Sequence, residues 1–385
     1  MGLLTSARRR GRRHDAELAQ GMDLLKQGRT EEAEQLLGAL ARDRAARHRR
    51  VDPRTIEARK AHGQALLALD RPDDAAAVFT LLVAECRQAH GDNAFQVGAA
   101  ALRLSEAQLV GGRHAEAEAL ARGTVADFTG REYSDGVHVR LRYVGRQVIG
   151  QAIEAAGRHA ESLAWFEAMA PAAARDLGEE HVSALGARFS ALGQLYMLGR
   201  SEEALAAAGS LVAATARMDD EWRAAAAASQ VLALIGAGRP ADAEAAVRAE
   251  IASRESLLGA DHPALQTFAV HLTHALSELG RHDDALAVVS SMPVVVPEIR
   301  PAWALVRAEA LHAAGHPDAP AAAREAVERC SARCAPTHYA TLTARTLLAA
   351  VSGTPAERTA LAALWEGHFG PAHPGTVRAR RNAAA

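Results

Sequence analysis

A glycine-arginine pair recurs along this chain of 385 residues and divides it into units of similar length. The pair begins at Gly28, Gly112, Gly157, Gly199, Gly238 and Gly280, and degenerate copies stand at Asp70 and Gly315. The steps from one copy to the next are 42, 42, 45, 42, 39, 42 and 35 residues. A period of this size is typical of a solenoid, in which each repeat buries its apolar face only against its neighbours.

The composition predicts that the repeats are helical. Apolar residues make up 49% of the chain, supplied largely by alanine, whereas aromatic residues make up only 4%. Alanine has the best helix propensity, and strands prefer β-branched and aromatic residues. The predicted fold is therefore an all-α, right-handed α-solenoid of about eight to nine helix-turn-helix repeats.

The unit around Gly280 shows how each repeat is built. Leu265, Leu272 and Leu276 form an apolar stripe on a first helix, which Gly280 ends by taking the left-handed conformation. Acids follow in the first turn of a second helix, where they oppose its dipole. Five residues after each turn stands a small residue that lets two helices approach closely: Ala33, Ala75, Ala117, Ser162, Ala204, Ala243 and Ala285.

Three segments are expected along the chain. Residues 1–13 are basic, with five arginines between Arg8 and Arg13, and are predicted to be disordered. Residues 14–372 form the repeat array, with turns near 28, 70, 112, 157, 199, 238, 280, 315 and 353. Residues 373–385 form a partial helix that caps the array.

These repeats resemble tetratricopeptide (TPR) repeats over roughly residues 14–385. The linker 258–263 reads Leu-Gly-Ala-Asp-His-Pro, and related linkers at 177–181 and 369–374 also contain histidine. With the long period, these linkers resemble the kinesin-light-chain-like subclass common in bacterial proteins, and the alanine- and arginine-rich composition suggests a GC-rich, actinobacterial-like source. HEAT or armadillo repeats are the alternative fold, because their periods also reach about 40–47 residues.

No motif for catalysis, cofactor or metal binding is evident. Gly236, Gly238 and Ala241 fit a dinucleotide-binding pattern, but Gly238 falls in register with the other repeat turns. No lysine follows a glycine as a phosphate-binding loop requires, and neither a zinc-protease helix nor a serine nucleophile elbow occurs. Cys330 and Cys334 are interpreted as thiols at a helix end. The sequence therefore predicts no enzyme, no cofactor and no metal.

Partners of such solenoids usually lie in the concave groove, which the first helices line. In the TPR register the resemblance places a polar, thinly charged set of residues there: Lys60, Gln64, Arg103, Glu106, Gln147, Gln151, Ser190, Ser229, His271 and His274. The asparagine that recurs in the kinesin-light-chain-like pattern is replaced by Arg103, Ser190, Ser229 and His271, and is kept at Asn382. The lysine- and asparagine-rich carboxylate clamp of chaperone-binding TPR modules is missing.

The function expected from these features is that of a non-catalytic scaffold, binding a peptide or protein segment in bacterial regulation or complex assembly. A nucleic-acid-associated regulator using the basic N-terminal segment is the first alternative. An enzyme whose site is assembled from distant residues is the second. A cytoplasmic protein without a membrane span is expected. A monomer is favoured over a homo-oligomer. Protein is favoured over nucleic acid as the partner.

Overall fold

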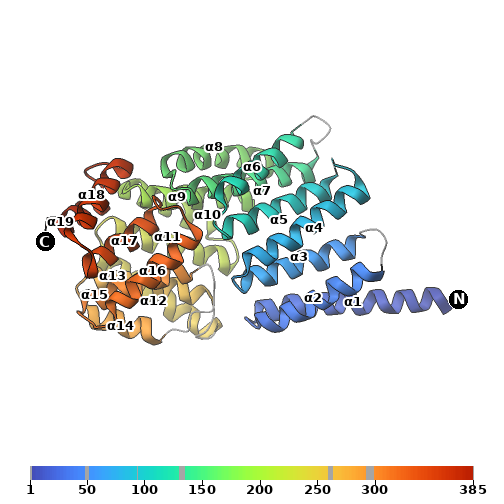
Figure 1. The fold of residues 1–385 in the computed structure, drawn as a ribbon, viewed down its shortest axis with the longest axis horizontal. Coiled ribbons are helices and arrows are strands. Elements are labelled where there is room, and N and C mark those ends of the chain that lie inside the picture. The colour runs from blue at the N-terminus through green and yellow to red at the C-terminus, as the bar shows by residue number, and fades with distance from the viewer. Residues whose placement is uncertain are drawn as a thin grey trace. The chain divides into compact units, whose positions relative to one another are not determined.

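The computed structural model describes residues 2–47, 52–92, 94–129, 135–258, 263–291 and 299–384. These residues form nineteen α-helices and no strand, and consecutive helices pack against each other in pairs (Figure 1). The predicted all-α fold of helix pairs is confirmed. Within the described part, no helix combines the length and apolarity needed to cross a membrane.

The helices fall into two compact units, residues 1–152 and 153–385. Those that begin in unit 1 are α1 (Gly2–Lys26), α2 (Thr30–Arg47), α3 (Pro53–Ala68), α4 (Pro72–His90), α5 (Phe95–Val110), α6 (His114–Asp127) and α7 (Gly136–Ala155). The last turn of α7 belongs to unit 2.

The other twelve helices form the rest of unit 2. They are α8 (His159–Leu177), α9 (Val182–Met197), α10 (Ser201–Thr215), α11 (Asp220–Gly236), α12 (Pro240–Leu258), α13 (Pro263–Glu278), α14 (His282–Ser291), α15 (Arg300–Ala313), α16 (Ala319–Arg333), α17 (Tyr339–Ser352), α18 (Pro355–Phe369) and α19 (Pro374–Ala384).

The recurring glycines end the first helix of each pair. Gly280 has a φ of 73°, a left-handed value that a glycine adopts without a Cβ clash. Its amide donates to the Ser277 carbonyl at 3.0 Å, and the Arg281 amide donates to the Leu276 carbonyl at 2.9 Å. These two bonds form a Schellman motif, which satisfies carbonyls that the helix end would leave unpaired. Gly353 differs, since its φ is −84°.

The arginine after each glycine has a local partner that explains its recurrence. The Arg281 guanidinium contacts Asp284 at 2.6 Å, three residues further along and in the first turn of α14. Equivalent pairs join Arg29 to Glu32 and Arg200 to Glu203. The acid thus faces both an arginine and the positive end of the helix dipole, and each pair stabilises the start of a second helix modestly.

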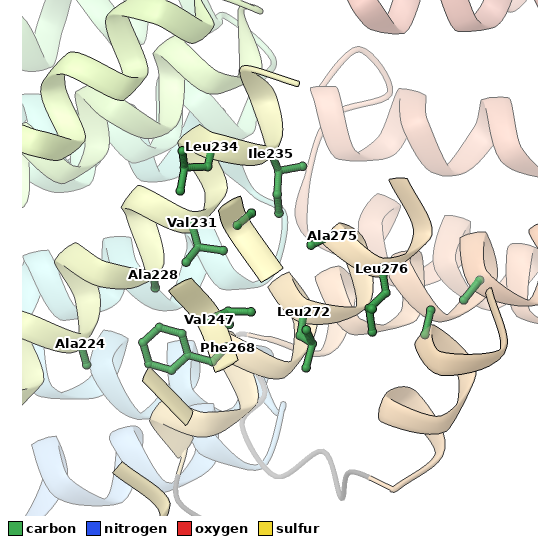
Figure 2. Packing of buried hydrophobic residues seen from close by; sticks show 13 residues of the cluster. Ala224, Ala228, Val231, Leu234, Ile235, Val247, Phe268, Leu272, Ala275 and Leu276 are labelled. Carbon is green, nitrogen blue, oxygen red and sulfur yellow. The ribbon is translucent and has the colours of Figure 1, made fainter. Parts of the chain in front are cut away.

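Small residues allow the two helices of a repeat to pack closely, as the sequence predicts. The residue five positions after each of the first seven turns is 0% exposed: Ala33, Ala75, Ala117, Ser162, Ala204, Ala243 and Ala285. Around Ala243, larger side chains complete the core. Figure 2 shows Val231 of α11, Val247 of α12 and Phe268 of α13 pointing into one apolar cluster.

The N-terminal segment differs from its prediction. Residues 2–13, expected to be disordered, continue as the first half of α1. The segment contains no proline, and arginine and leucine are good helix formers, so nothing local ends the helix before Gly28. The side chain of Arg13 pairs with Glu17 at 2.7 Å, one turn away.

The glycine-rich sequence that fits a dinucleotide-binding pattern is a repeat turn. Gly238 has a φ of 69° and joins two antiparallel helices, as its register indicates.

Cys330 is buried near the end of α16, and Cys334 follows that helix directly. Burial raises the pKa of Cys330 to about 11, so this thiol stays protonated at neutral pH. Of the linker at 258–263, residues 259–262 lie outside the described residues.

An acid begins α3 and gives a first testable prediction. Asp52 accepts a hydrogen bond from the Thr55 amide and pairs with Arg44, whose side chain is only 7% exposed. Burial alone would raise the pKa of Asp52, but the bonds from Arg44 and Thr55 outweigh it and lower the pKa to about 2. The carboxylate therefore adds stability above its ordinary pKa, and that stability is lost as the pH falls towards 2.

We expect Asp52→Asn to lower the free energy of unfolding by about 1 kcal/mol at neutral pH, because Asp52 is one-third exposed and solvent screens the pair. At a pH of about 2 the two proteins should unfold alike. Thermal denaturation followed by circular dichroism measures both values. If Asp52→Asn still had the lower free energy of unfolding at the acidic pH, its effect would come from disturbing the start of α3 and not from loss of the charge pair.

Candidate ligand-binding groove

The first helices of the repeats form one layer in each unit. In unit 1, α1 packs on α3 and α3 on α5; in unit 2, each odd-numbered helix from α9 to α19 packs on the next odd-numbered one. The second helices make no comparable contacts with each other in the described part of the chain. The first helices are therefore closer together and line the inner, concave side of each array.

In unit 1 the groove residues that the sequence singles out lie on successive first helices. Lys60 and Glu57 form an ion pair of 2.9 Å on α3, and Arg103 and Glu106 form one of 2.7 Å on α5. Gln64 lies on α3, and Gln147 and Gln151 lie on α7; all three are partly buried. Because the charges are matched within each helix, this surface offers a ligand mainly amide groups.

In unit 2 one of the four predicted residues, His274, lines the cavity described next. Ser190 lies on α9, and the Ser229 hydroxyl on α11 donates to the Ala225 carbonyl at 2.9 Å. Burial, and to a smaller extent the neighbouring His274, lowers the pKa of His271 to about 4, so its imidazole is neutral at physiological pH.

A cavity of about 220 Å³ opens between α13, α15, α17, α18 and α19 of unit 2. Since α13, α15, α17 and α19 are successive first helices, the cavity lies on the concave side. Its polar and aromatic lining includes His274, Ser277 and Glu278 of α13, Glu309 and His312 of α15, Tyr339 and Thr343 of α17, Trp365 of α18, and Arg378 and Asn382 of α19.

One cation and two carboxylates meet in this cavity. Arg378 Nη1 lies 3.2 Å from Glu309 Oε1. Burial would lower the pKa of Arg378, but Glu309, Tyr339 and Glu278 raise it above its ordinary value, so the guanidinium stays charged. Glu278 has His274 Nε2 at 3.9 Å, beyond hydrogen-bond distance.

An aromatic cluster supports the cavity wall. Tyr339 stands edge-on to Trp365, with ring centroids 5.6 Å apart, and also meets Tyr196 of α9 at 6.0 Å. Trp365 is 1% exposed, and its Nε1 donates to Thr346 Oγ1 at 2.9 Å. Aromatic pairs in this arrangement are favourable beyond their buried area, so the wall is held rigidly.

Residues from the C-terminal repeats of unit 2 form hydrogen bonds with its first repeats, which closes the array. The Tyr339 amide donates to Nε2 of His159 at 3.1 Å, across 180 residues of sequence. Since Nε2 accepts, the proton of this imidazole is on Nδ1, which donates to Gln194 Oε1 at 2.9 Å. Gln194 in turn hydrogen-bonds Glu154 at the end of α7. Burial lowers the pKa of His159, which favours this neutral form.

A second histidine completes this closure. Nδ1 of His373 accepts the Gly375 amide at 3.0 Å, and its Nε2 donates to the Met197 carbonyl at 3.0 Å. His373 therefore starts α19 and at the same time attaches it to α9. The linker histidines at 181 and 338 start α9 and α17 in the same way, each accepting the amide two residues further along.

Sequence reasoning missed most of the cavity, although a signal for Glu309 was present. Glu309 stands six residues before Gly315, as His274 stands before Gly280 and Glu106 before Gly112. Arg378 and Asn382 lie on α19, in the segment 373–385 that the sequence predicts as a partial helix, and the predicted groove set contains neither residue.

Comparison with known proteins shows the fold and no more. No family model and no curated protein matches the chain. A Rap protein complexed with competence and sporulation factor is similar over 97% of this chain and 99% of its own, at 12% identity and a TM-score of 0.53. The apo form of RapI covers 96% of this chain at 11% identity and a TM-score of 0.48.

A putative kinesin light chain repeat protein from Podosopora anserina covers 53% of this chain and 95% of its own, at 20% identity and a TM-score of 0.44. The consecutive helix pairs and the similarity to the Rap protein are consistent with a TPR-like α-solenoid, and identities this low establish only the fold.

Proposed function

We propose that this protein is a non-catalytic interaction scaffold whose concave groove holds a peptide or protein segment. The cavity of unit 2 is the main support, because polar side chains from successive first helices converge there beside a rigid aromatic wall. Ligand sites are typically concave, with a few placed polar groups. The Rap protein of similar fold, complexed with competence and sporulation factor, adds a precedent for ligand binding by this architecture.

The cavity volume matches one side chain of a bound polypeptide segment. Sites for drug-sized ligands enclose about 300–1,000 Å³. At about 220 Å³, this cavity accommodates a single amino-acid side chain, while the rest of a segment lies along the groove. A role in bacterial regulation or complex assembly would follow from such binding.

Selection from a random peptide display library tests this proposal. We expect the intact protein to enrich peptides, and Ala313→Arg to bind them at least roughly tenfold more weakly, since an arginine at this exposed position on the cavity wall blocks the opening. Ala206→Arg, on the exposed side of the second helix α10, is the matched control. Failure to enrich any peptide, or equal loss in both variants, would contradict groove binding.

A further inference from the structure

We infer that the cavity of unit 2 is a specificity pocket for a lysine or arginine side chain of the bound segment. This inference rests on the proposed function, because it assigns one subsite within the same groove. It goes further in naming the chemistry that the groove selects. The argument depends on the charge balance of the cavity, on its unpaired polar groups and on its aromatic wall.

The fixed charges of the cavity leave one negative charge unmatched. Arg378 pairs with Glu309, whose side chain is only 18% exposed. Glu278 is the second carboxylate; its side chain is 49% exposed, and the cavity lining includes no further arginine or lysine. A cation entering beside Glu278 and Glu309 would bring the fixed charges of the cavity to two positive and two negative groups.

Neutral groups around this position suit a cationic head. Ser277 Oγ is buried at the cavity wall without a hydrogen-bond partner in the described structure, so it can accept a bond from an ammonium or guanidinium group. The ring of Tyr339 also lines the cavity, and the faces of aromatic rings attract cations. An aliphatic stem would lie against the apolar lining residues Leu347 and Ala350.

An acidic side chain fits the cavity less well. The guanidinium of Arg378 is the only fixed cation in the lining, and it already pairs with Glu309. A ligand carboxylate would have to displace Glu309 and would leave a partly buried carboxylate without its partner, which costs free energy. It would also be repelled by Glu278. Charge balance therefore favours a basic ligand residue.

The library selection described above tests this inference directly. We expect the peptides enriched by the intact protein to share lysine or arginine at one position. For one such arginine peptide, replacing the arginine by uncharged citrulline should weaken binding by roughly tenfold, since hydrogen bonds to charged groups are worth more than neutral ones. The double variant Glu278→Gln/Glu309→Gln should lose the preference for arginine over citrulline and still bind both peptides.

Two further variants sharpen the result. Glu180→Gln/Glu202→Gln makes the same change in net charge at exposed positions outside the cavity, and should keep the full preference. Arg378→Gln removes the competing cation, and should keep or increase the preference.

Enriched peptides without a shared basic position would overturn the pocket assignment while the groove function stands. If the enriched peptides instead shared an acidic residue, and Arg378→Gln abolished that preference, the pocket would select an acidic side chain and not a basic one. No enrichment at all would overturn the groove function, and the pocket with it.

Discussion

Gly157→Ala is expected to lower the free energy of unfolding of unit 2 by about 3 kcal/mol. Gly157 has a φ of 78°, and an alanine there pays about 1 kcal/mol for the left-handed conformation. Its Cβ would also lie 2.6 Å from Thr337 Oγ1 and 3.0 Å from the backbone nitrogen of His338. Because His338 belongs to the linker that closes unit 2, this crowding separates the two ends of the array.

Gly238→Ala is the matched control for this experiment. Gly238 has nearly the same φ, 69°, but nothing lies within 4 Å of a Cβ built on it. It should therefore lose only about 1 kcal/mol. All four tryptophans of the chain lie in unit 2, so their fluorescence during denaturation follows this unit selectively. Equal losses in the two variants would show that the closure does not contribute to stability.

Glu154→Gln should stabilise unit 2 at alkaline pH. Burial raises the pKa of Glu154 to about 7, and the hydrogen bond from Gln194 offsets only part of that cost. A carboxyl with a raised pKa stabilises the fold below its unfolded pKa, and that stability is lost as the pH rises through about 7. Glutamine at this position carries no charge and can still accept from Gln194.

At a pH of about 8.5, we expect Glu154→Gln to raise the free energy of unfolding by about 2 kcal/mol. This is less than the whole pKa shift of Glu154 would give, because water reaches part of the site. At a pH of about 5, where Glu154 is mostly protonated in the folded protein, the gain should fall below about 1 kcal/mol. Tryptophan fluorescence during urea unfolding gives both values. Glu180→Gln, a control at an exposed position, should leave the free energy of unfolding unchanged at both pH values. If Glu154→Gln raised this free energy equally at both pH values, the charge of Glu154 would not be the cause.

The helix-turn-helix structure of each repeat could be predicted because each sequence signal for it acts within a few residues. A glycine at the helix end, acids in the next first turn and a small residue five positions on each have a short-range physical cause, and the structure has all three at Gly280. The extent of α1 was not predicted. The run of arginines predicts a disordered segment, whereas arginine is a good helix former and the segment continues as the first half of α1.

The cavity and the closure depend on long-range geometry that a single sequence does not specify. Each repeat rotates slightly relative to the one before, and the sum over several repeats determines whether the two ends meet. The bond from Tyr339 to His159 follows from that sum and not from any motif. Glu309 and Arg378 stand close together for the same reason, since these two residues are 69 apart in sequence.

Because its ends meet, unit 2 has a fixed number of repeats. An open solenoid tolerates the gain or loss of a repeat, since each repeat contacts only its neighbours. Here one repeat more or less would shift His373 away from the Met197 carbonyl that it binds. Changes in length would then be confined to the loops, and the variation available to this unit lies in the side chains along its inner face.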